Sequence, residues 1–381
     1  MDFTGDHERF RQMVRGVLAQ EVAPHFADWE SAGAFPAHAL FKTLARAGLL
    51  GLEYDPEYGG QGADHSFTVI LGEELGALHA GGVAMAISVH TDMATPSLHR
   101  FGTQELKRQY LKPAIEGEMV AAIAVTEPDA GSDVAAIRTR AVRDGNDWVI
   151  EGSKLYITNG AQADWLCLLV RTSNEPGYRG LSQIVFPTDT PGYTVSRKLS
   201  KLGNHSSDTA ELSFAEARVP VANTIGTIGN GFQQQMAQFQ RERMIAAYMA
   251  VGGMQEALDR TVRYLRERTT FGKPILANQY VAFRLAELVA DLDLLRQYNY
   301  ATADAFMRGE DTRRFATIAK LKAGRLQREV ADWCLQFHGG IGYMDETWIS
   351  RYFRDGRLLS IGGGADEMML KIICQLEGFE A

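Results

Sequence analysis

The chain has 381 residues, of which 45% are hydrophobic and 23% are charged. This composition is typical of globular proteins, and the length is sufficient for two or three domains. The net charge of −8 disfavours a general role in binding nucleic acid or a membrane surface.

Three cysteines, Cys167, Cys334 and Cys374, are widely spaced and form neither a disulfide framework nor a metal-ligand pattern. We therefore expect reduced thiols and no bound metal. The N-terminal segment MDFTGDHERF lacks the pattern of a signal or transit peptide, and no apolar run reaches membrane-spanning length. These features predict a cytoplasmic protein without membrane insertion; a processed organellar protein is the alternative.

Apolar residues recur at helical spacing through the first part of the chain, which predicts an N-terminal helical domain over residues 1–117. One apolar stripe covers residues 10–18, and another covers residues 40–47 after Pro36. A glycine-rich loop follows over residues 51–65. The helical pattern then resumes over residues 69–78 and 105–115.

The pattern changes to short apolar runs between turn-forming clusters, which predicts an antiparallel β domain over residues 118–225. From residue 226 to 381 the pattern is helical again. The expected helices of this C-terminal domain cover residues 232–267, 279–307 and 314–337, with a short last helix after Asp366. The predicted fold is therefore α+β, with a helical domain, a β domain and a C-terminal four-helix bundle.

The segment over residues 125–160 combines a small-residue turn, DAGSD, with a strand-like run that ends in YITNG. Gly131 allows the backbone to approach a bulky anionic group, and Ser132 adds a hydroxyl donor. These two residues alone would also fit a loop on any β domain, but the whole segment resembles the flavin-binding segment of the acyl-CoA dehydrogenases. The resemblance implies FAD contacts from Val125, Thr126, Gly131, Ser132, Thr158 and Tyr156, the last at a position where the family often has Trp.

Two further motifs support this resemblance. The first is RTTFG, over residues 268–272, and the second is QFHGGIGY, over residues 336–343. A guanidinium group can pair with phosphate oxygens, and closely spaced glycines allow close backbone approach. The resemblance implies that RTTFG binds the FAD of a neighbouring subunit in a homotetramer or homodimer. It also implies that the backbone of QFHGGIGY passes close to the adenine side of FAD. The residues concerned are Arg268, Thr270, Phe271, Gln279, Gln336, Gly339 and Gly340.

In this family a carboxylate removes the α-proton of an acyl-CoA thioester. Many members place this Glu near the C-terminus, where the matching residue here is Gly363. A smaller group, which includes isovaleryl-CoA and long-chain dehydrogenases, places it before an Arg on the long helix, and Glu242-Arg243 matches that arrangement. The resemblance therefore implies that Glu242 is the base and that the Gly363 N–H polarises the thioester carbonyl. Asp366 and Glu367 are the alternative carboxylates, and Glu367 also matches a position that contacts FAD.

Glu242 lies in the charged run Arg241-Glu242-Arg243, which would also fit a solvated helix face. Against this alternative, the residues that share its face, Gln238, Ala246, Met249 and Gly253, are mostly small or apolar. Small residues at positions 246, 250, 252 and 253 indicate space for a medium-to-long or methyl-branched acyl chain. The expected substrate contacts are Ser132, Arg243, Ala246 and Gly364, with Arg197, Lys198 and Lys201 as weaker candidates for binding the CoA phosphates.

The resemblance thus implies FAD-dependent α,β-dehydrogenation of an acyl-CoA, with electrons passed to an electron-transfer flavoprotein. Residues 361–367 also resemble those of citronellyl-CoA dehydrogenases. Two alternatives remain. One is a different flavin reaction on the same fold, such as that of an acyl-CoA oxidase or desulfinase. The other is an FAD-binding scaffold without catalysis, because the usual C-terminal Glu is absent.

Overall fold

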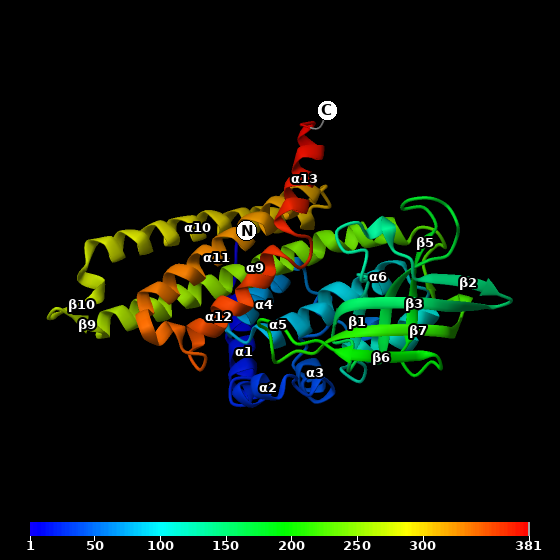
Figure 1. The fold of residues 1–381 in the computed structure, drawn as a ribbon, viewed down its shortest axis with the longest axis horizontal. Coiled ribbons are helices and arrows are strands. Elements are labelled where there is room, and N and C mark those ends of the chain that lie inside the picture. Colours follow the sequence, from blue (N-terminus) through cyan, green and yellow to red (C-terminus); the bar gives the residue numbers. More distant parts are fainter. Residues whose placement is uncertain (380–381) are drawn as a thin grey trace.

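The computed structural model describes residues 1–379 as two groups of helices with a β-sheet between them in the chain order (Figure 1). The N-terminal helices are α1 (Gly5–Glu21), α2 (Phe26–Ala32), α3 (Ala37–Arg46), α4 (His65–Ala77), α5 (Gly81–Ser88), α6 (Thr95–Phe101), α7 (Gln104–Leu106) and α8 (Lys112–Ile115). π-Helical turns precede α6 and α8, so the helix expected over residues 105–115 is interrupted. The buried faces of α1, α3, α4 and α5 form one apolar core.

The middle of the chain forms an eight-stranded sheet with the order β6-β7-β3-β2-β4-β5-β8, and β1 pairs with β4 beside this path. The strands are β1 (Ala121–Ala124), β2 (Arg140–Asp144), β3 (Asp147–Thr158), β4 (Trp165–Arg171), β5 (Leu181–Pro187), β6 (Tyr193–Lys198), β7 (Thr209–Pro220) and β8 (Thr224–Ile225). The prediction of an antiparallel sheet is wrong in part, because β1 runs parallel to β4 and β2 makes a parallel contact with it. β1 arrives directly from the helical domain, so no hairpin imposes an antiparallel direction on it.

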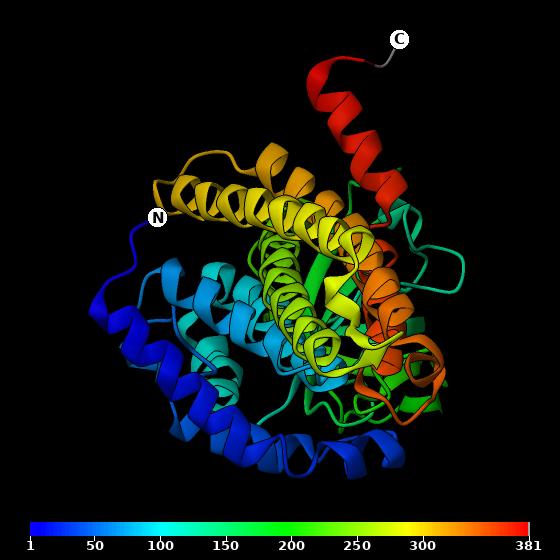
Figure 2. The same cartoon turned by 90° about the vertical axis from the view of Figure 1, so that its left-hand side faces the viewer.

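Long helices dominate the C-terminal part of the chain, as predicted. They are α9 (Gly231–Glu267), α10 (Gln279–Met307), α11 (Arg313–His338), α12 (Trp348–Gly356) and α13 (Asp366–Glu377), with the small hairpin β9 (Thr269–Thr270) and β10 (Lys273–Pro274) after α9. α9, α10 and α11 share one apolar core with part of α12. α13 projects from this group of helices, as Figure 2 shows.

The small residues near the middle of α9 have a packing role that the sequence does not reveal. A Cβ at Gly252 would lie 1.8 Å from the backbone oxygen of Glu73 on α4, and a Cβ at Gly76 would lie 1.9 Å from the backbone oxygen of Met249. Gly253 also packs against this crossing, near Tyr352. The expectation that Gly252 and Gly253 leave space for an acyl chain is therefore wrong, because helix α4 occupies that space.

Within residues 1–379, none of the helices has the length and apolar character needed to cross a membrane.

Candidate active site

Glu242 and Gly363, which are far apart in the sequence, meet in the structure. Glu242 lies on α9, and Gly363 lies in the loop between α12 and α13. A Cβ at Gly363 would be 3.1 Å from Glu242 Oε1. The Glu242 carboxylate thus lies directly beside the position from which a C-terminal catalytic Glu would project. Gly363 adopts φ +62° and Gly364 adopts φ +94°, a backbone conformation that favours glycine.

The surroundings of Glu242 disfavour a permanently ionised surface carboxylate. Burial raises its pKa to about 7, although the positive charges of Arg243 and Lys320 act in the opposite direction. Gly363 itself is exposed, so the carboxylate lies at an opening of the protein rather than deep in its core. A carboxyl group with a pKa near neutrality is suited to accept a proton in a general-base step.

The neighbouring Arg241 fixes this part of α9 to the N-terminal helices. Its guanidinium donates to Glu53 at 2.9 and 2.6 Å and lies 3.3 Å from Asp92. Gln238, one turn before Glu242, accepts a hydrogen bond from Ser97 of α6. Arg241 therefore has its charge satisfied inside the protein, and the run of charged residues is not a solvated helix face.

The segment that directly follows β1 and begins with Val125 packs against α9 one turn before Glu242. Val125, Ala130 and Ile137 form an apolar cluster, and Phe239 of α9 lies against it. Gln183 of β5 also donates to Gln235 of α9 at 3.0 Å. The sheet therefore holds the first predicted flavin segment close to the helix that carries Glu242.

A buried ion pair connects the parts of that flavin segment. Lys154 is fully buried and donates to the backbone oxygen of Val125 and to Glu127, both at 2.8 Å. Glu127 in turn accepts backbone N–H groups from Arg138 at 2.6 Å and Thr139 at 3.0 Å. Burial acts to raise the pKa of Glu127, but the Lys154 charge and these donors hold it below its usual value.

The residues of the β domain that are predicted to contact FAD lie next to open space. Tyr156 is 65% exposed with φ +61°, Thr126 and Thr158 are half-buried, and a Cβ at Gly131 would meet nothing within 4 Å. Ser132 is also exposed. An exposed aromatic ring beside accessible hydroxyl and glycine backbone groups fits one side of a flavin site, so these residues are compatible with FAD.

The second set of predicted FAD residues lies elsewhere in the same chain. The hairpin β9–β10 and the start of α10 occupy the end of the helical domain away from the β-sheet (Figure 1). The side chains in this set are exposed; they are Arg268, Thr270, Phe271, Gln279 and Gln336. A Cβ at Gly339 or Gly340 would meet nothing within 4 Å. One chain therefore does not bring the two predicted FAD segments together, and their joint use in one site stays a prediction.

His338 is a packed residue rather than an accessible ligand. It is buried, its ring stacks on Tyr264 with centroids 4.4 Å apart, and its Nδ1 lies 2.7 Å from the backbone oxygen of Cys334. This packed position disfavours a catalytic role for His338.

The structure places Arg243 differently from the sequence prediction. Arg243 is 8% exposed, and its Nη1 donates to Thr317 of α11 at 3.3 Å. A guanidinium buried between two helices does not line an open entrance for CoA phosphates. Among the weaker candidates, Lys201 donates to Ser207 at 2.6 Å and is half-buried, so it has a local structural role.

The other predicted substrate residues lie near Glu242 in the chain or in space. Ala246 is half-buried one turn after Glu242, and Gly364 directly follows Gly363. Their contact with substrate stays a prediction.

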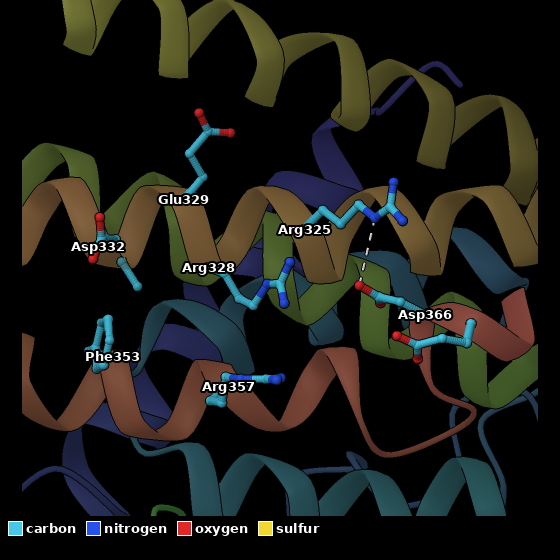
Figure 3. Close-up of a pocket in the computed structure, with 9 residues that line it drawn as sticks. Arg325, Arg328, Glu329, Asp332, Phe353, Arg357 and Asp366 are labelled. Carbon is cyan, nitrogen blue, oxygen red and sulfur yellow. Dashed lines mark ion pairs between the residues drawn. The ribbon is translucent and has the colours of Figure 1, made fainter. Parts of the chain in front are cut away.

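An open groove of about 730 Å³ lies between α11, α12 and the start of α13 (Figure 3). Its lining includes Asp366 and Glu367, the two alternative carboxylates. Asp366 is 6% exposed and lies 3.7 Å from the Nε atom of Arg325, whereas Glu367 is exposed. Neither carboxylate would lie within 4 Å of a Cβ at Gly363, the position that distinguishes Glu242.

Two buried lysines near the site were not predicted. Lys154 lies under the flavin segment, and Lys320 of α11 donates to the backbone oxygen of Gly364. Lys320 follows Ala316 and Ala319 on the buried side of α11 and precedes Ala323. A lysine among residues at apolar helical spacing is the signal that could have identified it.

Models of the acyl-CoA dehydrogenase family match three parts of the chain. The N-terminal domain model matches residues 4–118, the middle domain model residues 122–217 and the C-terminal domain model residues 229–376. Long-chain specific acyl-CoA dehydrogenase from Sus scrofa is 34% identical over 98% of this chain and 86% of its own length. Isovaleryl-CoA dehydrogenase from Solanum tuberosum is 32% identical over 97% of this chain and 90% of its own length.

Solved structures agree with these matches. Acyl-CoA dehydrogenase from Geobacillus kaustophilus is 37% identical with a TM-score of 0.95 and covers 98% of both chains. Glutaryl-CoA dehydrogenase from Mycobacterium smegmatis in complex with FADH2 is 26% identical with a TM-score of 0.93, covering 100% of this chain and 96% of that one. The chain therefore belongs to the acyl-CoA dehydrogenase family.

Proposed function

We propose that this protein catalyses FAD-dependent α,β-dehydrogenation of an acyl-CoA thioester to the trans-2-enoyl-CoA, with Glu242 as the catalytic base. The observation that carries the proposal is the meeting of Glu242 and Gly363. The Glu242 carboxylate lies where a base projecting from residue 363 would lie, and residue 363 is a glycine that leaves the space open.

The chain's own residues supply the proton chemistry. Glu242 in its ionised form accepts the proton from Cα of the thioester, which leaves negative charge on the carbonyl oxygen. The backbone N–H of Gly363 is the proposed donor to that oxygen, and such a donor stabilises developing enolate charge. Because burial raises the pKa of Glu242 to about 7, the carboxylate can take up a proton near neutral pH.

FAD is the cofactor that the family membership and the FADH2 complex of a related structure indicate. When bound, it supplies the acceptor for the hydride released from Cβ. Thr126, Gly131, Ser132, Tyr156 and Thr158 would hold it on the sheet side, with Val125 beneath them. Arg268, Thr270, Phe271, Gln279, Gln336, Gly339 and Gly340 would serve the FAD of a neighbouring subunit, which implies a homotetramer or homodimer.

We further propose that the substrate has a medium-to-long or methyl-branched acyl chain and that an electron-transfer flavoprotein is the electron acceptor. The support for the substrate class is the likeness to long-chain and isovaleryl-CoA dehydrogenases over nearly the whole chain. The glycines of α9 give no support, because they serve the contact with α4. Ser132, Ala246, Gly364 and the buried Arg243 remain the proposed substrate-side residues, and Glu367 remains a proposed FAD contact.

The test is anaerobic stopped-flow bleaching of the bound flavin by a panel of acyl-CoAs, with wild type compared to Glu242→Gln. We expect the substitution to slow bleaching by at least about 10²-fold, because an amide cannot accept the proton. Glu256→Gln is the matched control. Glu256 lies on the same helix, half-buried and 3.3 Å from Arg263, and its substitution should leave the rate unchanged.

The panel also separates the remaining possibilities. If Glu242→Gln bleaches like wild type, another base must act, and Glu367 is the first to examine. If butyryl-CoA bleaches the flavin fastest, the proposed substrate class is wrong. If no acyl-CoA bleaches the flavin, the protein is an FAD-binding scaffold. If an acyl-CoA bleaches the flavin and oxygen rapidly reoxidises it, the protein is an oxidase.

A further inference from the structure

Lys320 occupies an unusual position for a charged residue. It lies on α11 and is 1% exposed. Its ammonium group donates a hydrogen bond to the backbone oxygen of Gly364. Gly363, the preceding residue, lies beside Glu242, since a Cβ there would be 3.1 Å from Glu242 Oε1. The two glycines therefore connect a buried cation to the proposed base.

Four charged groups act on Lys320 in this environment. Asp366, Glu242 and Glu367 favour its protonated form, and Arg243 opposes it. Burial nevertheless dominates and lowers the pKa of Lys320 to about 8. The nearby carboxylates therefore stabilise the charged ammonium group against the effect of burial. The charged groups that act on Glu242 are Arg243 and Lys320, both of which favour the carboxylate.

A buried lysine is retained in a protein only where its ammonium group is paired or hydrogen-bonded. The partner here is a carbonyl of the glycine loop rather than a distant structural element. Residues 363 and 364 are both glycines with positive φ, +62° and +94°. Since neither has a side chain, neither position can hold the loop through side-chain contacts. A fixed donor beneath the loop determines where the Gly363 N–H lies relative to Glu242.

We propose that Lys320 is a positioning residue that holds the glycine loop and supplies the positive charge that favours the ionised form of Glu242. The proposal rests on the proposed function of Glu242 as base. It implies that Lys320 lowers the pH at which the enzyme becomes active. Lys320 reaches the proposed substrate side only through its hydrogen bond to the backbone oxygen of Gly364.

The sign of the effect follows from the charge. Removing the cation raises the pKa of Glu242, because an opposite charge nearby favours the ionised carboxylate. Since the ionised form is the active one, the acid limb of the pH–rate profile moves to higher pH. We expect a shift of about one pH unit, which lowers the rate about tenfold well below the midpoint and little above it.

The experiment measures the pH dependence of anaerobic flavin bleaching in the wild-type holoenzyme, Lys320→Met, Lys320→Gln and Lys322→Met. Gln keeps a hydrogen-bond donor but removes the charge, so Lys320→Gln should shift the midpoint as Lys320→Met does. Lys322 is exposed on the same helix, and its substitution should leave the midpoint in place. Merely weakened folding would lower the yield or the plateau rate without moving the midpoint.

A second readout does not depend on turnover. Infrared pH titration of the substrate-free holoprotein, minus the same titration of Glu242→Gln, isolates the protonation of the Glu242 carboxyl. We expect its midpoint to rise in the Lys320→Met background. An unchanged carboxyl midpoint in both Lys320 variants overturns the proposal. If Glu242→Gln bleaches normally but the carboxyl midpoint still shifts, Lys320 tunes Glu242 as inferred and it is the assignment of the base that fails.

Discussion

The buried pair Lys154–Glu127 gives a quantitative prediction about the flavin segment. Lys154→Met removes an ammonium group that is fully buried and leaves Glu127, 6% exposed, without its cation. The hydrogen bonds lost are those to the Val125 backbone oxygen and to the Glu127 carboxylate, both 2.8 Å. Breaking one side of a buried ion pair destabilises proteins by about 3–5 kcal/mol. We expect a loss of this size in the unfolding free energy of the apoprotein, measured by chemical denaturation.

The same substitution should weaken FAD binding, because Lys154 joins the backbone at Val125 to the Glu127 carboxylate that holds the N–H groups of residues 138 and 139. Equilibrium dialysis of the apoprotein with FAD measures this effect. The double variant Lys154→Met/Glu127→Gln removes the uncompensated charge and should regain part of the stability. The reasoning is refuted if Lys154→Met unfolds and binds FAD like wild type. A double variant no more stable than Lys154→Met would show that the uncompensated Glu127 carboxylate does not cause the loss of stability.

Two further predictions concern the base and the helix crossing. The rate of flavin bleaching should rise with pH through about 7, because the pKa of Glu242 is raised to about 7 and only its ionised form accepts the proton. A flat rate from pH 6 to 8 in stopped-flow measurements would contradict this assignment. Gly252→Ala should destabilise the protein by at least about 2 kcal/mol in chemical denaturation, because its Cβ would lie 1.8 Å from the backbone oxygen of Glu73. Gly16→Ala on α1 is the control. Its Cβ meets nothing within 4 Å, so helix propensity predicts that the unfolding free energy rises by up to about 1 kcal/mol. An equal loss of unfolding free energy in both variants would argue against the role of Gly252 in the helix crossing.

The helices of this protein could be predicted because their signals are local. Apolar residues at helical spacing identified α9, α10 and α11 to within about one residue at each end. The parallel pairing of β1 with β4 was missed because strand partners are chosen over long sequence separations. The helix crossing at Gly252 was missed for the same reason, since a glycine shows that space is needed but not what fills it.

The same difference between local and long-range signals applies to the residues of the candidate site. Family resemblance identified Glu242 and Gly363 as a related pair, and the structure places them in contact. The resemblance did not identify Lys320 or Lys154, because each lysine donates a hydrogen bond to a backbone carbonyl that is distant in sequence. The resemblance placed Arg243 on the substrate side because it directly follows Glu242, whereas here its side chain is buried against α11.

The contact between Glu242 and Gly363 also explains why the two positions depend on each other. A side chain at residue 363 would need space that the Glu242 carboxylate already fills, and it would have to adopt φ +62°, a conformation that L-residues rarely tolerate. Conversely, a small residue at 242 would leave the opening beside Gly363 without a carboxylate. Lys320 donates a hydrogen bond to the backbone oxygen of Gly364 and so ties the glycine loop to α11. The location of the proposed base on α9 therefore depends on the whole arrangement of α9, α11 and the glycine loop, and not on Glu242 alone.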